Sequence, residues 1–375
     1  MFIGIDGNEA NLENRVGSNI YAYEILWQLY HLTKENKDLK FKIYLKEYFQ
    51  TDFPKVDQAW NYEIFGPSIL WTQWRLPLKL YQEKLGKSLP SLFFTPGHYA
   101  PRFSPIPTVV SIMDLAFLKF PNEFLSKDLN QLVAWTKYSV KNAKHIFAIS
   151  EATKKDIIEN YQITEDKITV TYLGFDYKKL EHDEQDESFQ KFAINFDLQS
   201  KYLLYIGTLQ PRKNLIRLIE AFAQMKKSED YRKLKLIIVG KKGWLYENIF
   251  AKVKELGLSK EIIFTGFVSE YEKIQLLKHA YCLVLPSLYE GFGIPVLEAM
   301  TLGVLVLASH VSSLPEIGGE AIAYIEKPQS TENIYQSLIK MLQLTEDKRK
   351  DLIFKGKKQA QKISWEKCGK QTLET

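Results

Sequence analysis

Residues 282–300 read CLVLPSLYEGFGIPVLEAM and carry the pattern from which we infer the fold class. The continuous apolar run Cys282–Leu285 is typical of a parallel strand covered on both faces. Gly291 and Gly293 give the following loop the backbone freedom to approach a ligand, and Pro295 suits the first turn of a helix, where its missing N–H is tolerated. A strand, a glycine-containing loop and a helix N-terminus in this order favour a site for an anion or a hydroxyl-rich ligand.

The same order recurs along the whole chain. The candidate strands of the N-terminal half are Phe2–Asp6, Phe41–Leu45, Tyr62–Phe65, Leu92–Thr95, Thr108–Met113, His145–Ile149 and Ile168–Tyr172. Those of the C-terminal half are Tyr202–Ile206, Leu234–Val239, Ile262–Thr265, Cys282–Pro286, Val304–Ala308 and Ala321–Ile325. Amphipathic segments such as Ile20–His31 and Lys127–Asn142 lie between strands. This alternation predicts an α/β chain of two Rossmann-like, doubly wound domains.

Length and composition also favour two domains. The 375 residues, 45% of them hydrophobic and 25% charged, are typical of a globular chain and exceed one core of ~150 residues. The acidic stretch 181–190, EHDEQDESFQ, indicates a break near residues 176–195. We therefore expect an N-terminal domain over residues 1–176 and a C-terminal domain over residues 195–358. Residues 360–375 are expected to pack back onto the first domain or to form a tail.

Charge and cysteine content narrow the class of protein. The 50 Lys and Arg residues against 45 Asp and Glu residues give a net charge of +5. That excess is weaker than in a dedicated nucleic-acid binder, although it permits peripheral contact with anionic lipid. Two cysteines and no Cys/His cluster give no sign of a disulfide framework or a zinc site. With no signal peptide and no apolar run of ~18 residues, we expect a cytoplasmic chain.

Charged residues beside two helix starts are the candidate site. Residues 205–215 read YIGTLQPRKNL and place Arg212 and Lys213 where a helix begins, with Asn214 as a cap. Two cations do not stabilise a helix N-terminus, so we expect them to hold an anion such as a pyrophosphate.

Two glutamates flank the other helix start, within residues 282–300. Seven residues lie between Glu290 and Glu298. They are therefore not expected to act as the carboxylate pair of a hydrolase on one atom, but they can grip two parts of an extended ligand. Gly17, before a helix at Ile20, marks a third helix start that can face a phosphate.

The segment EGFGIPVLE, residues 290–298, resembles the E-x7-E signature of retaining glycosyltransferases of the GT-B fold, family 4. Further segments resemble that family in the same order: AKHIFAISEAT (143–153), GTLQPRKN (207–214), GFVS (266–269) and SLPEI (313–317). The resemblance runs from about residue 1 to about residue 370. It implies two Rossmann-like domains that face a central cleft.

The resemblance implies a role for each candidate residue. Glu290 would contact hydroxyls of the transferred sugar, while Arg212 and Lys213 would neutralise the diphosphate leaving group and so assist catalysis. The implied donor-binding residues are Glu298 on the ribose, Phe267 and Val268 beside the base, Gly17 against the diphosphate, and Gly291, Phe292, Gly293 and Ile294, whose N–H groups would hold the sugar and the distal phosphate.

One strand end departs from the family pattern. Residues 109–115 read VVSIMDL, and Met113 stands where relatives usually have histidine. A role of the main-chain carbonyl would survive this change, whereas an imidazole role would not. Asp114 is retained as a candidate catalytic residue, with a strand-end cap as its alternative role.

Three N-terminal residues are candidates for binding an acceptor. His98 follows a strand, and Trp71 and Trp74, three residues apart in an expected helix, can stack on a sugar ring. Their alternative roles are a structural loop histidine and core tryptophans.

The resemblance implies a hexosyltransferase that takes mannose or glucose from GDP-mannose or UDP-glucose and passes it to a saccharide or lipid-linked acceptor in cell-surface polysaccharide or glycolipid synthesis. No metal or other cofactor is expected, because no Asp-x-Asp follows a strand end. A phosphorylase or a sugar-nucleotide epimerase would need signatures that the sequence lacks. The alternative is a non-catalytic nucleotide-sugar-binding protein on the same scaffold, which Met113 favours.

Overall fold

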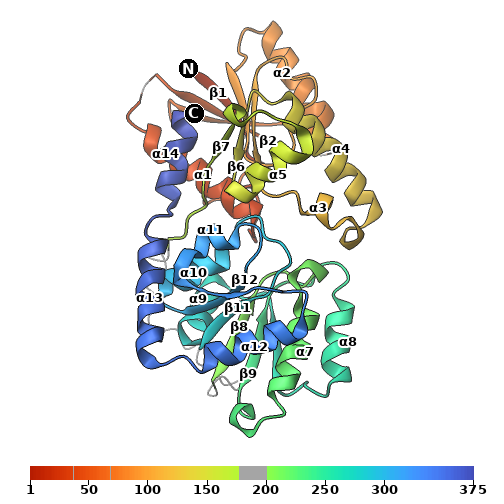
Figure 1. The fold of residues 1–375 in the computed structure, drawn as a ribbon. Coiled ribbons are helices and arrows are strands. Elements are labelled where there is room, and N and C mark those ends of the chain that lie inside the picture. The colour runs from red at the N-terminus through yellow and green to blue at the C-terminus, as the bar shows by residue number, and fades with distance from the viewer. Residues whose placement is uncertain (37, 68, 177–200) are drawn as a thin grey trace. The chain divides into compact units, whose positions relative to one another are not determined.

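The structure is a computed structural model that describes residues 1–36, 38–67, 69–176 and 201–375 (Figure 1). The chain forms two compact units. The first comprises Met1–Lys119, Ser126–Gly174 and Ser364–Thr375, and the second comprises Phe120–Leu125 and Phe175–Ile363. The acidic stretch 181–190 and most of the expected break lie outside the described residues.

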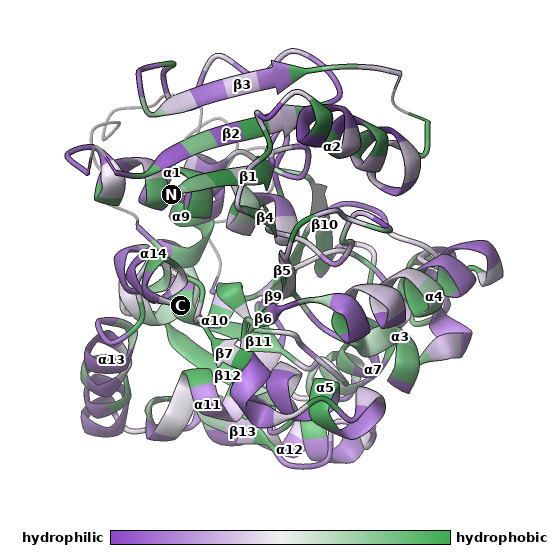
Figure 2. Cartoon of the chain, turned by 90° about the horizontal axis from the view of Figure 1, so that it is seen from above, coloured by the Kyte–Doolittle hydropathy of each residue, from purple (hydrophilic) through white to green (hydrophobic). Residues whose placement is uncertain are grey.

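Within the described residues, the first unit contains a seven-stranded parallel sheet in the order β3-β2-β1-β4-β5-β6-β7. Its strands are β1 (Phe2–Asp6), β2 (Lys40–Leu45), β3 (Trp60–Ile64), β4 (Leu92–Thr95), β5 (Thr108–Ile112), β6 (His145–Ala148) and β7 (Ile168–Val170). Its helices are α1 (Ser18–Thr33), a π-helical turn (Trp71–Arg75), α2 (Leu76–Leu85), α3 (Ala116–Lys119), α4 (Ser126–Asn142), α5 (Glu151–Tyr161) and α14 (Trp365–Glu374). Figure 2 shows β1 as mostly hydrophobic, whereas α2 and α4 alternate hydrophobic and hydrophilic residues.

The second unit contains, in its described part, a six-stranded parallel sheet in the order β10-β9-β8-β11-β12-β13. Its strands are β8 (Tyr202–Ile206), β9 (Lys235–Val239), β10 (Ile262–Gly266), β11 (Cys282–Leu285), β12 (Leu305–Ser309) and β13 (Ala323–Ile325). Its helices are α7 (Leu215–Met225), α8 (Glu247–Glu255), α9 (Glu270–His279), α10 (Ile294–Leu302), α11 (Leu314–Gly318), α12 (Thr331–Leu342) and α13 (Glu346–Ala360). The α/β class and the two doubly wound sheets predicted from the sequence are confirmed.

In each sheet the strand order reverses direction at one point. The reversal lies between β1 and β4 in the first unit and between β8 and β11 in the second. Connections on the two sides of such a point leave toward opposite faces of the sheet, which opens a crevice beyond the carboxyl ends of the strands. In an open α/β sheet this crevice is the expected ligand site.

The segment Phe120–Leu125 belongs to the second unit, although the sequence placed it in the first domain. The ring centroid of Phe120 lies 6.4 Å from that of Tyr289, and that of Phe124 lies 5.4 Å from that of Trp244. These aromatic contacts explain why Phe120–Leu125 groups with the second unit. The sequence of these six residues gave no sign that Tyr289 and Trp244 are the partners of Phe120 and Phe124.

The last residues form the helix α14, which packs against α1 in the first unit. Trp365 is 6% exposed, and its ring centroid lies 6.4 Å from that of Tyr21. A Cβ at Gly174 would lie 2.0 Å from the Trp365 backbone nitrogen, so only glycine fits this approach. The C-terminal segment is therefore a docking helix rather than a tail.

We expect Trp365→Ala to destabilise the chain by about 3 kcal/mol or more, because it empties a buried site between α14 and α1. Urea unfolding followed by circular dichroism measures this change. Phe354→Ala, at a 58% exposed side chain of α13, is the control and should change stability by no more than about 0.5 kcal/mol. Equal effects of the two substitutions would contradict the packing described for α14.

Candidate functional site

The loops that follow β8 and β11 are joined by hydrogen bonds in the second unit. The Leu288 N–H donates to the Arg212 carbonyl at 2.8 Å, and the Arg212 Nη1 donates to the Tyr289 carbonyl at 2.9 Å. The buried Asn214 side chain donates to the Pro286 carbonyl at 3.0 Å. Parallel neighbours end at the same edge of a sheet, so the candidate residues of the two loops meet there.

Lys213 and Glu290 form a buried ion pair at this edge. The Lys213 Nζ lies 2.6 Å from each carboxylate oxygen of Glu290, and the Ser287 hydroxyl donates to Oε1 at 2.6 Å. The Arg212 Nη1 lies 3.8 Å from Oε2. Burial acts to raise the pKa of Glu290, but Lys213 and Arg212 outweigh it and hold that pKa below its ordinary value. The three groups together therefore carry one excess positive charge.

The start of α10 is shaped by glycine and by two serines. Gly293 caps the helix with φ +100°, and a Cβ there would lie 2.7 Å from Leu314 Cδ2. The Glu290 N–H donates to the Ser312 hydroxyl at 2.8 Å. The Ser313 hydroxyl lies 2.9 Å and 2.8 Å from the carbonyl oxygens of Glu290 and Phe292. These contacts hold residues 290–293 in place, and the sequence gave no role to either serine.

Glu298 lies one turn inside α10 and is 3% exposed. Its Oε1 lies 2.7 Å from the Lys273 Nζ, which is also 2.7 Å from the Glu270 Oε2. Burial raises the pKa of Glu298, and Lys273 offsets only part of this. Lys273 was missed from the sequence, because a lysine early in a helix does not show whether it faces solvent or a buried carboxylate.

The loop between β10 and α9 presents one exposed aromatic ring. Phe267 is 50% exposed, whereas the neighbouring Val268 is buried. The Lys241 Nζ lies 4.7 Å from the centroid of the Phe267 ring, within the range of a cation–π contact. An exposed ring beside a cation suits a flat, electron-rich group such as a nucleobase.

In the first unit, Gly17 and His98 follow the two strands on either side of the reversal. Gly17 caps α1 with φ +52°, and a Cβ there would meet open space. The Met113 N–H donates to the His98 Nε2 at 3.2 Å, so the ring carries its proton on Nδ1. Burial lowers the pKa of His98, which keeps the imidazole neutral at pH 7.

The contacts of Met113 and Asp114 bear on the departure from the family pattern. The Met113 carbonyl accepts a hydrogen bond from the Thr153 hydroxyl at 3.2 Å. The Asp114 Oδ1 accepts from the Ala116 N–H at 3.0 Å, so the strand-end cap exists. An imidazole therefore lies beside residue 113, although it comes from His98.

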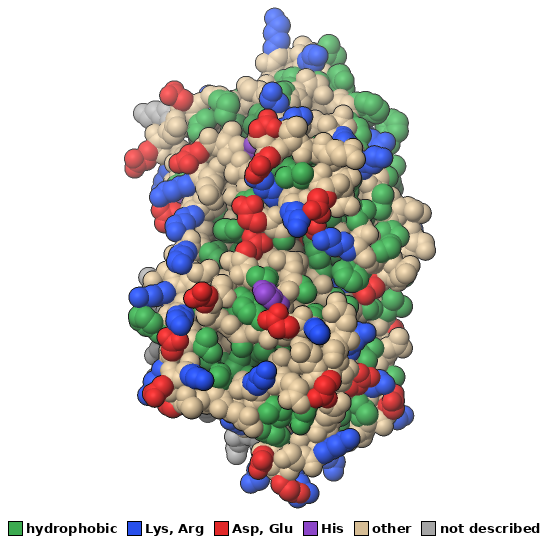
Figure 3. All heavy atoms as spheres, in the orientation of Figure 1, with side chains coloured by type: hydrophobic (Ala, Val, Ile, Leu, Met, Phe, Trp, Pro, Cys, Tyr) green, Lys and Arg blue, Asp and Glu red, His purple; other side chains and the backbone are tan. Residues whose placement is uncertain are grey.

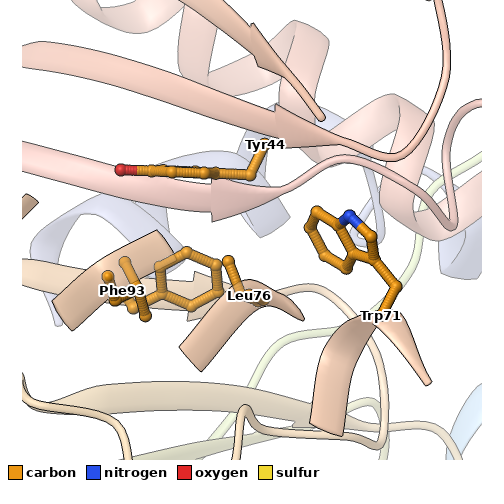
Figure 4. Packing of buried hydrophobic residues seen from close by; sticks show 5 residues of the cluster. Tyr44, Trp71, Leu76 and Phe93 are labelled. Atoms are coloured by element: carbon orange, nitrogen blue, oxygen red, sulfur yellow. The ribbon is translucent and has the colours of Figure 1, made fainter. Parts of the chain in front are cut away.

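The prediction of a sugar-stacking role for Trp71 is corrected. Trp71 is buried with Tyr44, Leu76 and Phe93, and its Nε1 donates to the Phe65 carbonyl at 3.0 Å (Figure 4). A π-helical turn holds more residues per turn than an α-helix, so residues three apart no longer share a face. Trp74 consequently points into solvent, and its acceptor role stays a prediction.

The described residues show neither a cluster of metal-binding side chains nor a helix that could span a membrane. Among them, no three or more His, Cys, Asp and Glu side chains gather as a metal site would require. No helix in the described part of the chain is long and apolar enough to cross a membrane.

Two family models match adjoining parts of the chain. Residues 186–359 match the glycosyl transferases group 1, and residues 88–179 match glycosyltransferase family 4. The O-antigen chain mannosyltransferase B of Escherichia coli is 33% identical over 237 residues, which are 63% of this chain and 61% of that relative. The match thus spans less than two thirds of the relative's length.

Solved structures show the same fold along the whole chain. WaaG, a glycosyltransferase involved in lipopolysaccharide biosynthesis, superposes with a TM-score of 0.73 at 16% identity, over 100% of this chain and 99% of that one. Anabaena HepE in complex with UDP and glucose superposes with a TM-score of 0.71 at 17% identity, over 100% of this chain and 98% of that one. The fold is GT-B, and residues 88–179 and 186–359 carry the glycosyltransferase family 4 and glycosyl transferases group 1 domains.

Lys213→Met should destabilise the chain by about 3 kcal/mol at neutral pH, because it leaves the Glu290 carboxylate buried with only the more distant Arg212. The lowered pKa of Glu290 means that the pair stabilises the fold above the unfolded-state pKa and loses this effect as the pH falls through the folded-state pKa. The difference between wild type and variant should therefore shrink in acid. Thermal unfolding measures it, and the double substitution Lys213→Met/Glu290→Gln should recover most of the loss. No recovery would contradict the charge pairing.

Asp6→Asn should stabilise the chain at neutral pH. Asp6 ends β1. Its Oδ1 accepts hydrogen bonds from the backbone N–H of Asn8 at 3.0 Å and from the side-chain amide of Asn8 at 2.7 Å. The side-chain oxygen of an asparagine at position 6 can accept the same two bonds. Burial raises the pKa of Asp6 to about 6, so the carboxylate destabilises the fold increasingly as the pH rises toward that value. The gain should be on the order of 2 kcal/mol at neutral pH and vanish below the unfolded-state pKa. Thermal unfolding across this pH range measures it, and a pH-independent gain would contradict the raised pKa.

Proposed function

We propose that the chain is a retaining hexosyltransferase that moves a hexose from a nucleotide-diphosphate sugar to a saccharide or lipid-linked acceptor. The observation that carries the proposal is the convergence of Arg212 and Lys213 on Glu290 at the strand-order reversal of the second sheet. A cationic loop and a helix N-terminus at such a crevice suit a diphosphate.

The Lys213–Glu290 pair suggests how the donor would enter. A bound diphosphate can replace the Glu290 carboxylate as the partner of Lys213, because both are anions that accept hydrogen bonds from an ammonium group. Glu290 would then be released toward hydroxyls of the sugar. Without a donor, the same pairing keeps both buried charges compensated.

The chemistry follows from the charges that develop. The bond from the anomeric carbon to the diphosphate oxygen breaks, while a bond from that carbon to the acceptor oxygen forms on the same face. The acceptor proton passes to the leaving diphosphate. Negative charge grows on the diphosphate in the transition state, and Arg212 and Lys213 are placed to stabilise it.

Mannose and glucose are the two sugars we favour. The E. coli relative is a mannosyltransferase of O-antigen chains, and HepE was solved with UDP and glucose. GDP-mannose and UDP-glucose are therefore the donors to test first. Phe267 would stack on the base, and Glu298, held by Lys273, would bind the ribose hydroxyls. We place the reaction in cell-surface polysaccharide or glycolipid synthesis.

The alternative, a non-catalytic nucleotide-sugar-binding protein, had the loss of histidine at residue 113 as its support. The imidazole of His98 beside Met113 weakens that support, since the strand edge keeps a neutral imidazole. Release of nucleoside diphosphate from either donor in the presence of acceptor would favour the enzyme. Donor binding without any turnover would favour the alternative.

A thermal-shift series with GDP, UDP, ADP and their sugar conjugates tests the donor site. A ligand at ~100 times its dissociation constant stabilises by about 2.7 kcal/mol. We expect a clear shift with one base, lost in Glu298→Ala. Glu255→Ala is the matched control, because its side chain is 62% exposed on α8. Absence of a shift with every nucleotide in a folded protein would overturn the proposed donor site.

A further inference from the structure

The outer face of the π-turn and α2 carries a row of large, exposed hydrophobic side chains. This apolar stripe consists of Leu70, Trp74, Leu78, Tyr81 and Leu85, which are between 45% and 87% exposed. The spacing of four, three and four residues places Trp74, Leu78, Tyr81 and Leu85 along one side of the helical segment, and Leu70 directly precedes the π-turn. Single exposed hydrophobic residues are ordinary on a protein surface, but a continuous row of five is not.

The inner face of the same segment is already occupied. Trp71, Leu76 and Leu80 pack with Tyr44 and Phe93 in a buried cluster (Figure 4). The helix therefore has no freedom to rotate and bury the stripe within its own unit.

Buried polar contacts add to this anchoring. The Glu83 carboxylate accepts hydrogen bonds from the Lys42 ammonium, at 2.7 Å, and from the Tyr44 hydroxyl. The Lys79 Nζ lies 3.8 Å from Glu83 and 2.5 Å from Glu63. Side chains of β2 and β3 thus hold α2 in one orientation, so the stripe is a fixed surface.

The exposed charged side chains of residues 69–88 have one sign. Arg75, Lys84 and Lys87 are exposed within the described residues 69–88. Glu83 is the only acidic residue of that segment, and it is turned inward. Figure 3 shows hydrophobic side chains beside Lys and Arg at the surface in the region that α2 occupies in Figure 1.

A neighbouring loop contacts the π-turn. The Arg102 Nε donates to the side-chain oxygen of the buried Gln73 at 2.8 Å, which ties the loop to the π-turn.

We propose that this face binds the surface of an anionic lipid bilayer. The stripe would enter the headgroup region, while Arg75, Lys84 and Lys87 contact lipid phosphates. Hydrophobic anchors whose exposed charged neighbours within residues 69–88 are all cations are complementary to such a surface, whereas an interface with a protein would be expected to include exposed anions or a concave groove. The proposal does not depend on the activity proposed above.

Flotation with vesicles of phosphatidylglycerol or of phosphatidylcholine tests the proposal. The wild-type chain should float with phosphatidylglycerol and stay behind with phosphatidylcholine. Leu78→Glu/Leu85→Glu should lower the partition coefficient at least about tenfold, because it removes apolar anchors and adds negative charge. The matched control, Tyr48→Glu/Phe354→Glu, makes the same charge change at exposed side chains outside the stripe and should float like wild type. Thermal unfolding verifies that both variants fold.

Equal flotation of the stripe variant and the wild type would overturn the proposal. So would equal binding to both lipids, which would leave the cations without a role. A third contrary outcome is a dimer, detected by light scattering, that the stripe variant dissociates while the wild type fails to float. In that case the stripe is an interface between two copies of the chain. Loss of flotation in Lys84→Glu/Lys87→Glu would support the electrostatic part of the contact.

Discussion

The parallel pairing of β8 with β11 determines where the charged groups of the candidate site lie. Cys282 pairs with Leu203 and Leu283 with Leu204, although about eighty residues separate the two strands in the sequence. Both strands end at the same edge, and the strand order reverses between them. The following loops therefore meet instead of diverging with their helices. Arg212, Lys213 and Glu290 come together for this reason.

A site built from opposite charges is stable before any ligand arrives. Two partly buried cations with no anion nearby would destabilise the fold, and Glu290 removes most of that cost. In the proposed reaction the same carboxylate would turn to hydroxyls of the sugar. The charge pairing itself is compatible with a stable empty state.

The strands were predictable because parallel strands covered on both faces are continuous apolar runs, and the predicted ranges differ from the observed ones by a few residues at most. The grouping of Arg212, Lys213 and Glu290 in one unit followed from their places after strands of the C-terminal half. The role predicted for Trp71 and the omission of Lys273 both went wrong because these side chains are positioned by tertiary contacts. The π-turn turned Trp71 into the core, and the inward direction of Lys273 follows from the burial of Glu298. No local pattern carries that information.

The return of α14 to the first unit has a consequence for biosynthesis. The residues that complete this unit, 364–375, are translated after the whole of the second unit. The surface of α1 that Trp365 contacts must therefore stay uncovered by α14 while the ribosome synthesises roughly half of the chain. The usual order, in which the N-terminal domain finishes folding first, cannot hold here. The second unit has all its residues available earlier, so a nascent chain reaches its complete second unit before its complete first unit.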